Sequence, residues 1–249
     1  DEIWHLDLHA NTWRLSAETP IEALTAQARL CGQPCPALVH LGGVAQGGEL
    51  FVDLEAVGVL SVVSPHSTAI LRHAAASLAV SPFLDTVRMF TVGIGDVALD
   101  NDGVEQVDSL DAAVDAAAMT LGSTIAASRA TSTFGLRVTG MGGEAWEPAI
   151  VIAAGEHDAG EVAHLAAVCS PGRGMAAMVD VAVEGVGWQV RADGDCHVVE
   201  PIGVRLAPVG CDAADVAAVA NLLHTAAAVP LVPVPLATIA TVVATRVGS

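Results

Sequence analysis

The chain has 249 residues, 53% of them hydrophobic and 15% charged, so it can bury a sizeable core and is not an intrinsically disordered protein. Its 28 acidic residues outnumber ten arginines, and the absence of lysine leaves a formal net charge of −18. A surface this acidic repels nucleic acid and anionic membranes, which argues against DNA binding. We therefore expect protein partners or other domains of the same polypeptide, with no nucleic acid and no direct membrane insertion of this segment.

Five cysteines are scattered along the chain in a pattern that does not predict a disulfide framework: Cys31, Cys35, Cys169, Cys196 and Cys211. Cys31 and Cys35 have a CxxxC spacing, but no second pair accompanies them, so a zinc site has little support. Free thiols indicate a reducing compartment, and we expect the cytoplasm or the cytoplasmic part of a membrane-anchored protein. The chain begins Asp-Glu-Ile-Trp with no signal peptide, which favours a domain taken from a longer protein.

The N-terminal region predicts a β-hairpin and a short helix. Residues 3–16 alternate between apolar and polar side chains on either side of a turn, as paired strands do. This alternation brings His5, Asp7 and His9 to one side of a strand, where they form either a metal-binding face or a polar row that faces solvent. The short helix is predicted over residues 16–30, where a proline lies near the first turn.

A second hairpin, a buried strand and a helix follow, and together they begin a βαβ unit. Residues 37–41 and 49–54 form the hairpin around two glycine pairs, and the apolar run 57–63 predicts a strand that stops at Ser64-Pro65. The helix after this turn has one apolar face, which contains Ile70, Leu71, Ala74, Ala75 and Leu78.

The turn between this strand and helix lies where nucleotide-binding α/β proteins hold phosphate, because the first N–H groups of the helix point into it. A P-loop needs glycines to wrap the phosphates and a lysine to neutralise their charge. Here the turn is Ser64-Pro65-His66-Ser67-Thr68, without glycine, and Pro65 has no amide to donate. The turn is then either a helix start capped by Ser67 or Thr68 or a weak anion or nucleotide site.

If that weak site exists, the candidate cofactor-binding residues are those of the turn and one distant cation: Ser64, His66, Ser67, Thr68 and Arg173. Arg173 is a lone cation in an acidic chain, which suggests anion binding, although pairing with a nearby carboxylate is the commoner role. We expect no bound cofactor and no catalytic residue in this turn.

The surrounding residues resemble the entry into FtsK-type motor domains, a family that includes the type VII secretion ATPases. The matching pattern is His40-Leu-Gly-Gly, then Gly47-Gly-Glu-Leu-Phe-Val-Asp-Leu, then Gly58-Val-Leu-Ser-Val-Val-Ser, with Ser77-Leu78 in the helix. The sequence also resembles, over residues 38–225, the ATPase-like segment of large actinobacterial proteins that join membrane helices, a LysM domain and a bacterial transcriptional activator domain. That likeness is carried by Val52-Asp-Leu-Glu-Ala-Val-Gly, Leu78-Ala-Val-Ser-Pro, Gly172-Arg-Gly-Met-Ala-Ala and Glu200-Pro-Ile-Gly-Val.

Further elements complete the alternation of strands and helices. Buried strands are expected over residues 86–93, 148–154 and 174–183, a helix over 109–127, and a hairpin formed by 187–192 and 196–206. A last helix, 212–227, begins at Asp212 and is expected to point Val216, Val219, Leu222 and Leu223 inward. Residues 122–147 are rich in Ser, Thr and Gly and predict a loose connection with a short strand over 134–138.

This order predicts an α/β fold: a P-loop-NTPase-like, Rossmann-like layered sheet with helices on both faces, and β-hairpins near both ends. We expect three regions: residues 1–36 with the first hairpin and short helix, residues 37–228 with a degenerate ATPase-like domain, and residues 229–249 as an extended segment that contains prolines.

Two groups of polar residues follow the predicted strands. Asp96 comes after the strand 86–93, where α/β proteins form ligand sites, although a surface loop would also place an aspartate there. Glu156 and Asp158 follow the strand 148–154, which the resemblance makes the position of the motors' acidic, metal-orienting pair. The spacing of His157, Glu161 and His164 makes them weak metal or acid–base candidates on one helix face, but an acidic helix start explains the acids equally well.

Three functions remain open. The absent lysine and glycines favour a non-catalytic ATPase-like interaction or regulatory module of a larger, membrane-associated actinobacterial protein over an enzyme. One alternative is a nucleotide-binding or small-ligand sensor at the strand ends near residues 64–68, Asp96 and Gly155. The other is an enzyme, either a reduced NTPase that uses Arg173 with Glu156 or Asp158, or a metal-dependent hydrolase around His157 and His164.

Overall fold

A computed structural model describes residues 35–44, 47–81, 87–99, 101–128, 147–207 and 209–228, and the backbone of two N-terminal strands. Those strands, β1 (Trp4–Asp7) and β2 (Thr12–Leu15), pair antiparallel, which confirms the first predicted hairpin. The predicted helix 16–30, the predicted strand 134–138, the segment 229–249 and Cys31 lie outside the described residues.

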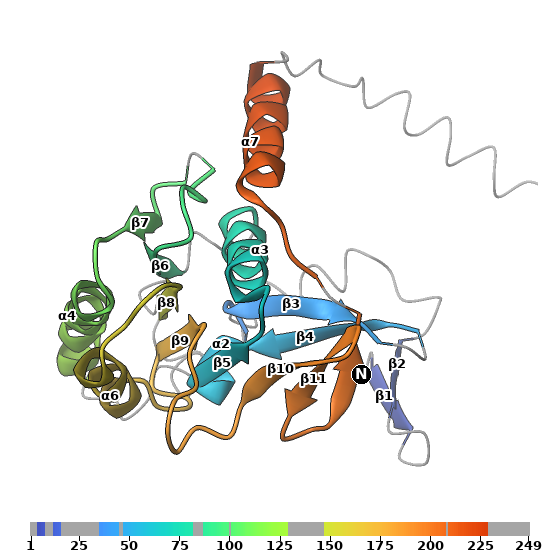
Figure 1. Ribbon diagram of the computed structural model, residues 1–249, viewed down its shortest axis with the longest axis horizontal. Helices are drawn as coiled ribbons and strands as arrows, with labels where there is room; N and C mark the ends of the chain where they lie inside the picture. The colour runs from blue at the N-terminus through green and yellow to red at the C-terminus, as the bar shows by residue number, and fades with distance from the viewer. Residues whose placement is uncertain are drawn as a thin grey trace, which may run out of the picture.

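The centre of the fold is an eight-stranded sheet of order β12-β11-β10-β5-β9-β8-β6-β7 (Figure 1). Its strands are β5 (Val59–Val63), β6 (Arg88–Val92), β7 (Val104–Gln106), β8 (Ala149–Ala153), β9 (Met175–Val179), β10 (Gln189–Asp193), β11 (Cys196–Glu200) and β12 (Val204–Leu206). All neighbours from β10 to β7 are parallel, and β10, β11 and β12 form an antiparallel edge. The predicted α/β class is confirmed.

Alternate residues of the central strands enter two different cores. In β8, Ile150 and Ile152 face one core, while Ala149, Val151 and Ala153 face the other. All five are buried, so the strand is apolar on both faces, as expected when helices cover both sides of a parallel sheet. This two-sided burial explains why the strand appears in the sequence as an uninterrupted apolar run.

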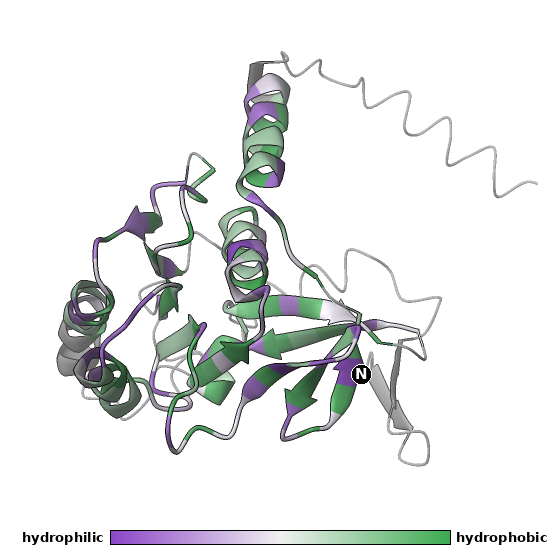
Figure 2. Ribbon diagram, viewed as in Figure 1, coloured by the Kyte–Doolittle hydropathy of each residue, from purple (hydrophilic) through white to green (hydrophobic). Residues whose placement is uncertain are grey.

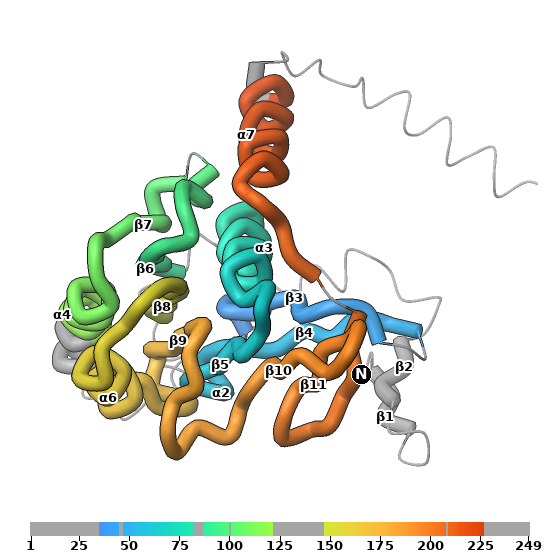
Figure 3. The backbone as a smooth tube through the Cα atoms, in the orientation of Figure 1, coloured from blue at the N-terminus to red at the C-terminus, as the bar shows by residue number. Residues whose placement is uncertain are grey.

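Helices cover both faces of the sheet (Figures 1 and 3). One face packs against α2 (Leu54–Val57), α3 (Ser67–Ala79) and the hairpin of β3 (Leu38–Gly43) and β4 (Glu49–Asp53). The other face packs against α4 (Leu110–Ser128) and α6 (Ala159–Val168). No described helix is sufficiently long and apolar to cross a lipid bilayer.

Helix α3 buries the apolar face that its sequence predicts: Ile70, Leu71, Ala74, Ala75 and Leu78 are all at most 2% exposed. The prediction that Ser67 or Thr68 caps this helix is wrong. His66 occupies the N-cap position and its side chain makes no capping hydrogen bond. The Ser64 hydroxyl instead accepts the His66 N–H at 3.2 Å, because the turn is short enough to bring them together.

His40 connects the β3–β4 hairpin to helix α3. Its Nε2 lies 2.7 Å from a carboxylate oxygen of Glu49, and its Nδ1 lies 3.3 Å from Nε2 of His73. An ionised carboxylate can only accept, so Nε2 of His40 donates to Glu49. Burial, followed by the nearby His40, lowers the pKa of His73.

The C-terminal hairpin and the sheet edge differ from the sequence expectation. The predicted strand 196–206 is divided into β11 and β12 by a turn at residues 201–203. The strand β7 was not predicted, since its three residues carry no apolar run. Helix α4 confirms the helix predicted over residues 109–127, and it continues through the first residues of the stretch 122–147, for which a loose connection was expected.

Helix α7 (Ala213–Ala228) stands clear of the main body, and this corrects the prediction for its apolar residues (Figures 1 and 2). Asp212 accepts the Asp215 N–H at 2.9 Å, which confirms the predicted cap. Only Val216 is buried, whereas Val219 is 41%, Leu222 67% and Leu223 39% exposed. The periodicity identified an amphipathic helix correctly, but it could not show whether this chain covers the apolar face.

The position of Val216 gives a prediction for unfolding in urea. Val216→Ala should lower the free energy of unfolding by about 1–3 kcal/mol because it removes packed methyl groups. Leu222→Ala, in the same helix but at an exposed position, should change it by less than about 0.5 kcal/mol. Equal losses for the two variants would show that the apolar face of α7 is covered within the chain.

Gly93 sets the spacing between the ends of β6 and β8. It has φ +68°, and a Cβ at this position would lie 2.0 Å from the carbonyl oxygen of Ala154. Gly93→Ala should therefore destabilise the protein by about 2–4 kcal/mol through backbone strain and overlap. Gly95→Ala is the matched control: it has φ +80° with no atom within 4 Å of the added Cβ, so it should cost only the strain. Equal unfolding midpoints for the two variants would contradict this.

Candidate functional site at the carboxyl edge of the sheet

The parallel strands place several loops at one edge of the sheet. The carboxyl ends of β5, β6, β8 and β9 lie side by side there, because these strands are parallel members of one sheet. Such an edge is where open α/β sheets bind ligands. It carries the Ser64 turn, Asp96, the loop that begins at Gly155, and Asp180.

The turn after β5 is closed by hydrogen bonds of Ser64. Only residues 64–66 separate β5 from α3. The Ser64 Oγ lies 3.0 Å from Nε2 of His197, and the Ser67 N–H donates to the Ser64 carbonyl at 3.1 Å. The hydroxyl is thus directed to β11, which is separated from β5 by β10, and the Ser67 amide is bonded within the turn.

His197 is the residue of this site that the sequence analysis missed. It lies on β11, 133 residues after Ser64, and is 4% exposed. Burial, followed by the nearby His66, lowers the pKa of His197, so its imidazole is neutral at pH 7. The sequence signal was present as a single polar residue in the apolar alternation of a hairpin strand, but nothing in the local pattern pairs it with Ser64.

The end of β8 carries no acidic pair. Ala153 and Ala154 are buried where the family resemblance implied metal-orienting acids, and Glu156 is exposed beyond them. The Gly155 N–H donates to Oδ2 of Asp180 at 3.0 Å, which ties this loop to the end of β9. The expected role of Glu156 therefore has no geometric support at this edge.

His157 and Asp180 face each other beneath this loop. Nε2 of His157 lies 3.8 Å from Oδ1 of Asp180, and their side chains are 3% and 14% exposed. Neither of these two buried atoms has a hydrogen-bond partner. Asp180 was missed because the predicted strand 174–183 ran through it, whereas β9 ends at Val179.

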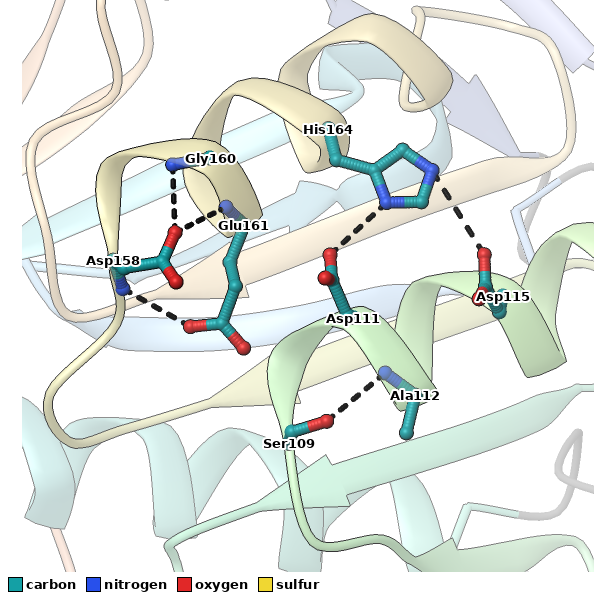
Figure 4. A network of polar contacts seen from close by, with 8 residues as sticks. All are labelled: Ser109, Asp111, Ala112, Asp115, Asp158, Gly160, Glu161 and His164. Atoms are coloured by element: carbon teal, nitrogen blue, oxygen red, sulfur yellow. Dashed lines mark hydrogen bonds and ion pairs between the residues drawn. The ribbon is translucent and has the colours of Figure 1, made fainter.

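The other weak metal candidates have separate structural roles (Figure 4). Asp158 caps α6 by accepting the Gly160 and Glu161 N–H groups, and the Glu161 carboxylate accepts the Asp158 N–H at 3.0 Å, which forms a capping box. His164 lies 3.1 Å from Asp111 and 3.9 Å from Asp115 on α4. His157 precedes α6 rather than sharing its face, and within the described ranges no three ligating side chains converge as a metal site.

Arg173 and Asp96 are not brought to the Ser64 turn. Arg173 is exposed just before β9 begins, and β9 is parallel to β5, so it lies at the amino edge while Ser64 lies at the carboxyl edge. It therefore cannot join the proposed phosphate-binding set. Asp96 is exposed, and its side chain accepts the Ala98 N–H at 3.1 Å, which is the loop role considered for it. Ser67 and Thr68 lie half-buried in the first turn of α3.

A cavity of about 310 Å³ lies away from this edge, near the start of β5. Its lining includes Val57, Val59, Cys169, Glu184 and Trp188. Burial raises the pKa of Cys169 to about 12, so its thiol stays protonated and unreactive at neutral pH. The cavity supplies no reactive group to the site described above.

Comparisons with known proteins support the fold. No protein-family model and no curated protein sequence matches the chain. EssC (ATPases 2 and 3) of Geobacillus thermodenitrificans has a TM-score of 0.51 at 11% identity, covering 78% of this chain and 49% of that one. EccC (ATPases 2 and 3) of Thermomonospora curvata, in complex with a signal sequence peptide, has a TM-score of 0.50 at 11% identity, covering 79% and 44%.

The conjugation coupling protein TcpA of pCW3 is also similar, with a TM-score of 0.49, 14% identity and coverage of 76% of this chain and 71% of that one. The chain spans less than half of the EssC and EccC chains that it matches. At these identities the likeness shows only that this chain shares the fold of these ATPase domains. The expected similarity to type VII secretion ATPases is confirmed at that level.

The neutral state of His197 gives a pH prediction. A histidine whose folded pKa lies below its ordinary value of about 6.5 binds protons more readily in the unfolded chain. Its contribution to stability is complete above pH 6.5 and is lost as the pH falls from there through the folded pKa. The free energy of unfolding should therefore fall between pH 7 and pH 5, and His197→Gln should reduce that slope.

His73→Gln is the matched comparison, because burial and His40 lower the pKa of His73 in the same direction. Urea unfolding at several pH values measures both variants. A slope that His197→Gln leaves unchanged would show that His197 is not held neutral by the fold.

Proposed function

We propose that this chain is an ATPase-like interaction or regulatory module that does not hydrolyse nucleotides. The observation that carries the proposal is the closed turn after β5, in which the Ser64 side chain is bonded to His197. A phosphate loop in this position would have to present free backbone amides to a ligand. Here the Ser67 amide is bonded within the turn and Pro65 has none to offer.

The electrostatics of the edge support the same proposal. Phosphoryl transfer depends on cations that stabilise the charge on the transferred group and on carboxylates that position the metal and water. The chain has no lysine, Arg173 lies at the other edge, and β8 ends in alanines. With a net charge of −18, the protein also repels a polyanionic nucleotide.

The exposed apolar residues of α7 support a role in binding protein. Val219, Leu222 and Leu223 are exposed on one helix whose only charged side chain is Asp215. An apolar helix face of this kind is the usual contact surface of a helix that packs on another domain or protein. The partner in this proposal is another domain of the same polypeptide or a separate protein.

The resemblance to multidomain actinobacterial proteins extends the proposal. The module would be one part of a larger, membrane-associated protein and would act on its cytoplasmic side. Support comes from the Val52-Asp-Leu-Glu-Ala-Val-Gly and Gly172-Arg-Gly-Met-Ala-Ala motifs and from the free thiols at Cys169, Cys196 and Cys211.

A small-ligand sensor is the second candidate, and one observation favours it. Nε2 of His157 and Oδ1 of Asp180 are buried without hydrogen-bond partners at the edge where α/β proteins bind ligands. A ligand that formed hydrogen bonds to both atoms would remove the free-energy penalty of leaving them buried and unpaired.

Binding and turnover of ATP test the main proposal. The chain with millimolar MgATP should show no shift in its thermal unfolding midpoint and no phosphate release above the buffer rate. Glu156→Gln and Ser67→Ala should give the same unfolding midpoint and phosphate release as the unchanged chain, because in this proposal neither side chain contacts a nucleotide.

A saturable shift with MgATP that Ser67→Ala removes would contradict the closed turn. Phosphate release that Glu156→Gln abolishes would contradict the loss of hydrolysis. A shift produced by small molecules other than nucleotides, and removed by His157→Gln, would instead favour the sensor.

A further inference from the structure

The same turn brings together a hydroxyl and a base in a geometry suited to nucleophilic chemistry. The Ser64 Oγ lies 3.0 Å from Nε2 of His197, within the hydrogen-bond distance at which a general base can take a proton from a serine. The two residues come from β5–α3 and β11, so the sheet itself fixes their separation. We propose that Ser64 is a nucleophile activated by His197 and that its substrate is a small carboxylic ester.

The hydrogen bonds around Ser64 leave its proton available to His197. The His66 N–H donates to the Ser64 Oγ, so the hydroxyl's own hydrogen is free to point toward His197. A neutral imidazole accepts on one nitrogen only, so the proposed base is the tautomer with its proton on Nδ1 and with Nε2 facing Ser64. His197 is 4% exposed, and its burial favours the neutral form that a base requires.

The position of Ser64 gives a substrate access to the hydroxyl. Ser64 is half-buried at the junction of a strand and a helix, and Pro65 and His66 beside it are exposed. The His66 and Ser67 N–H groups beside it both donate to Ser64 itself, so neither of them is offered to the carbonyl oxygen of a substrate.

The reaction is a hydrolysis that needs only water as a second reactant. Ser64 Oγ attacks the carbonyl carbon while Nε2 of His197 takes its proton. The carbon–oxygen bond to the alcohol then breaks, and the alcohol leaves with that proton. Water, deprotonated by the same nitrogen, next attacks the acyl carbon; the bond from that carbon to Ser64 Oγ breaks, Oγ takes the proton back from His197, and the acid is released. His197 has no carboxylate among its described partners, so turnover should be slow.

This inference does not depend on the proposed function, because the chemistry uses neither a nucleotide nor a metal. A chain that binds MgATP could still have a reactive Ser64, and a chain with an unreactive Ser64 could still lack ATP hydrolysis. The two failures are therefore distinguishable.

Covalent labelling with an alkyl fluorophosphonate tests the proposal directly. Ser64 Oγ would displace fluoride from phosphorus, and His197 would take the proton. The full chain should gain the mass of one phosphonyl group, located on Ser64 by peptide mass spectrometry. Ser64→Ala should remove this label, whereas Ser67→Ala, which changes a neighbouring serine outside the pair, should keep it.

His197→Gln should slow labelling by about 10²-fold or more, the usual contribution of a general base. Imidazole added to His197→Ala should restore part of the rate, and the rate of the unchanged chain should rise with pH and level off below pH 7. Circular dichroism establishes that each variant is folded, and the pH profile needs no variant. Absence of label on Ser64, or an unchanged rate in folded His197→Gln, would overturn the proposal.

Discussion

The hydrogen bond between Ser64 and His197 determines the character of the carboxyl edge. It connects the turn that follows β5 to β11, on the antiparallel side of the sheet, and it directs the Ser64 hydroxyl to the buried imidazole of His197. Because His197 is buried, the hydroxyl supplies a hydrogen bond that the imidazole would otherwise lack. The bond thus stabilises the buried histidine and closes the turn at once.

The rest of the edge is consistent with this closed turn. The loop after β8 is held by Asp180 through the Gly155 amide, and α6 begins with a capping box whose acids serve the helix rather than a metal. The polar groups of this edge that the structure describes are used in local structure. The α/β scaffold is stabilised by strands that are buried on both faces, and that burial does not depend on what the edge binds.

Much of the fold could be predicted because burial leaves a periodic pattern. The apolar run of β8 and the apolar face of α3 could be predicted from the local sequence, since the burial of each residue follows from its place in a strand or helix. Helix α7 shows the limit of this argument: its periodicity predicts an apolar face, but whether anything covers that face depends on how the chain continues in space. The predicted cap of α3 is wrong for a related reason, because only the geometry of the turn shows that His66, rather than Ser67 or Thr68, occupies the N-cap position.

The site was predictable only in part. Ser64 could be singled out from its position after an apolar strand, but its partner His197 is distant in sequence, and the pairing arises from strand order. Arg173 was grouped with the turn by its charge, yet parallel strands place it at the opposite edge. Asp180 lay inside the predicted strand 174–183, whereas β9 ends at Val179, one residue before Asp180. Each error concerns which edge or neighbour a residue meets, which topology decides.

The most direct measurement of the central claim is nitrogen-15 NMR of the His197 imidazole, recorded with and without MgATP. A closed turn predicts a neutral ring with its proton on Nδ1 and Nε2 accepting from Ser64, and no change in these signals or in the Ser67 and Thr68 amides at millimolar MgATP. A saturable shift of those amides, accompanied by loss of the Nε2 hydrogen bond, would contradict the account.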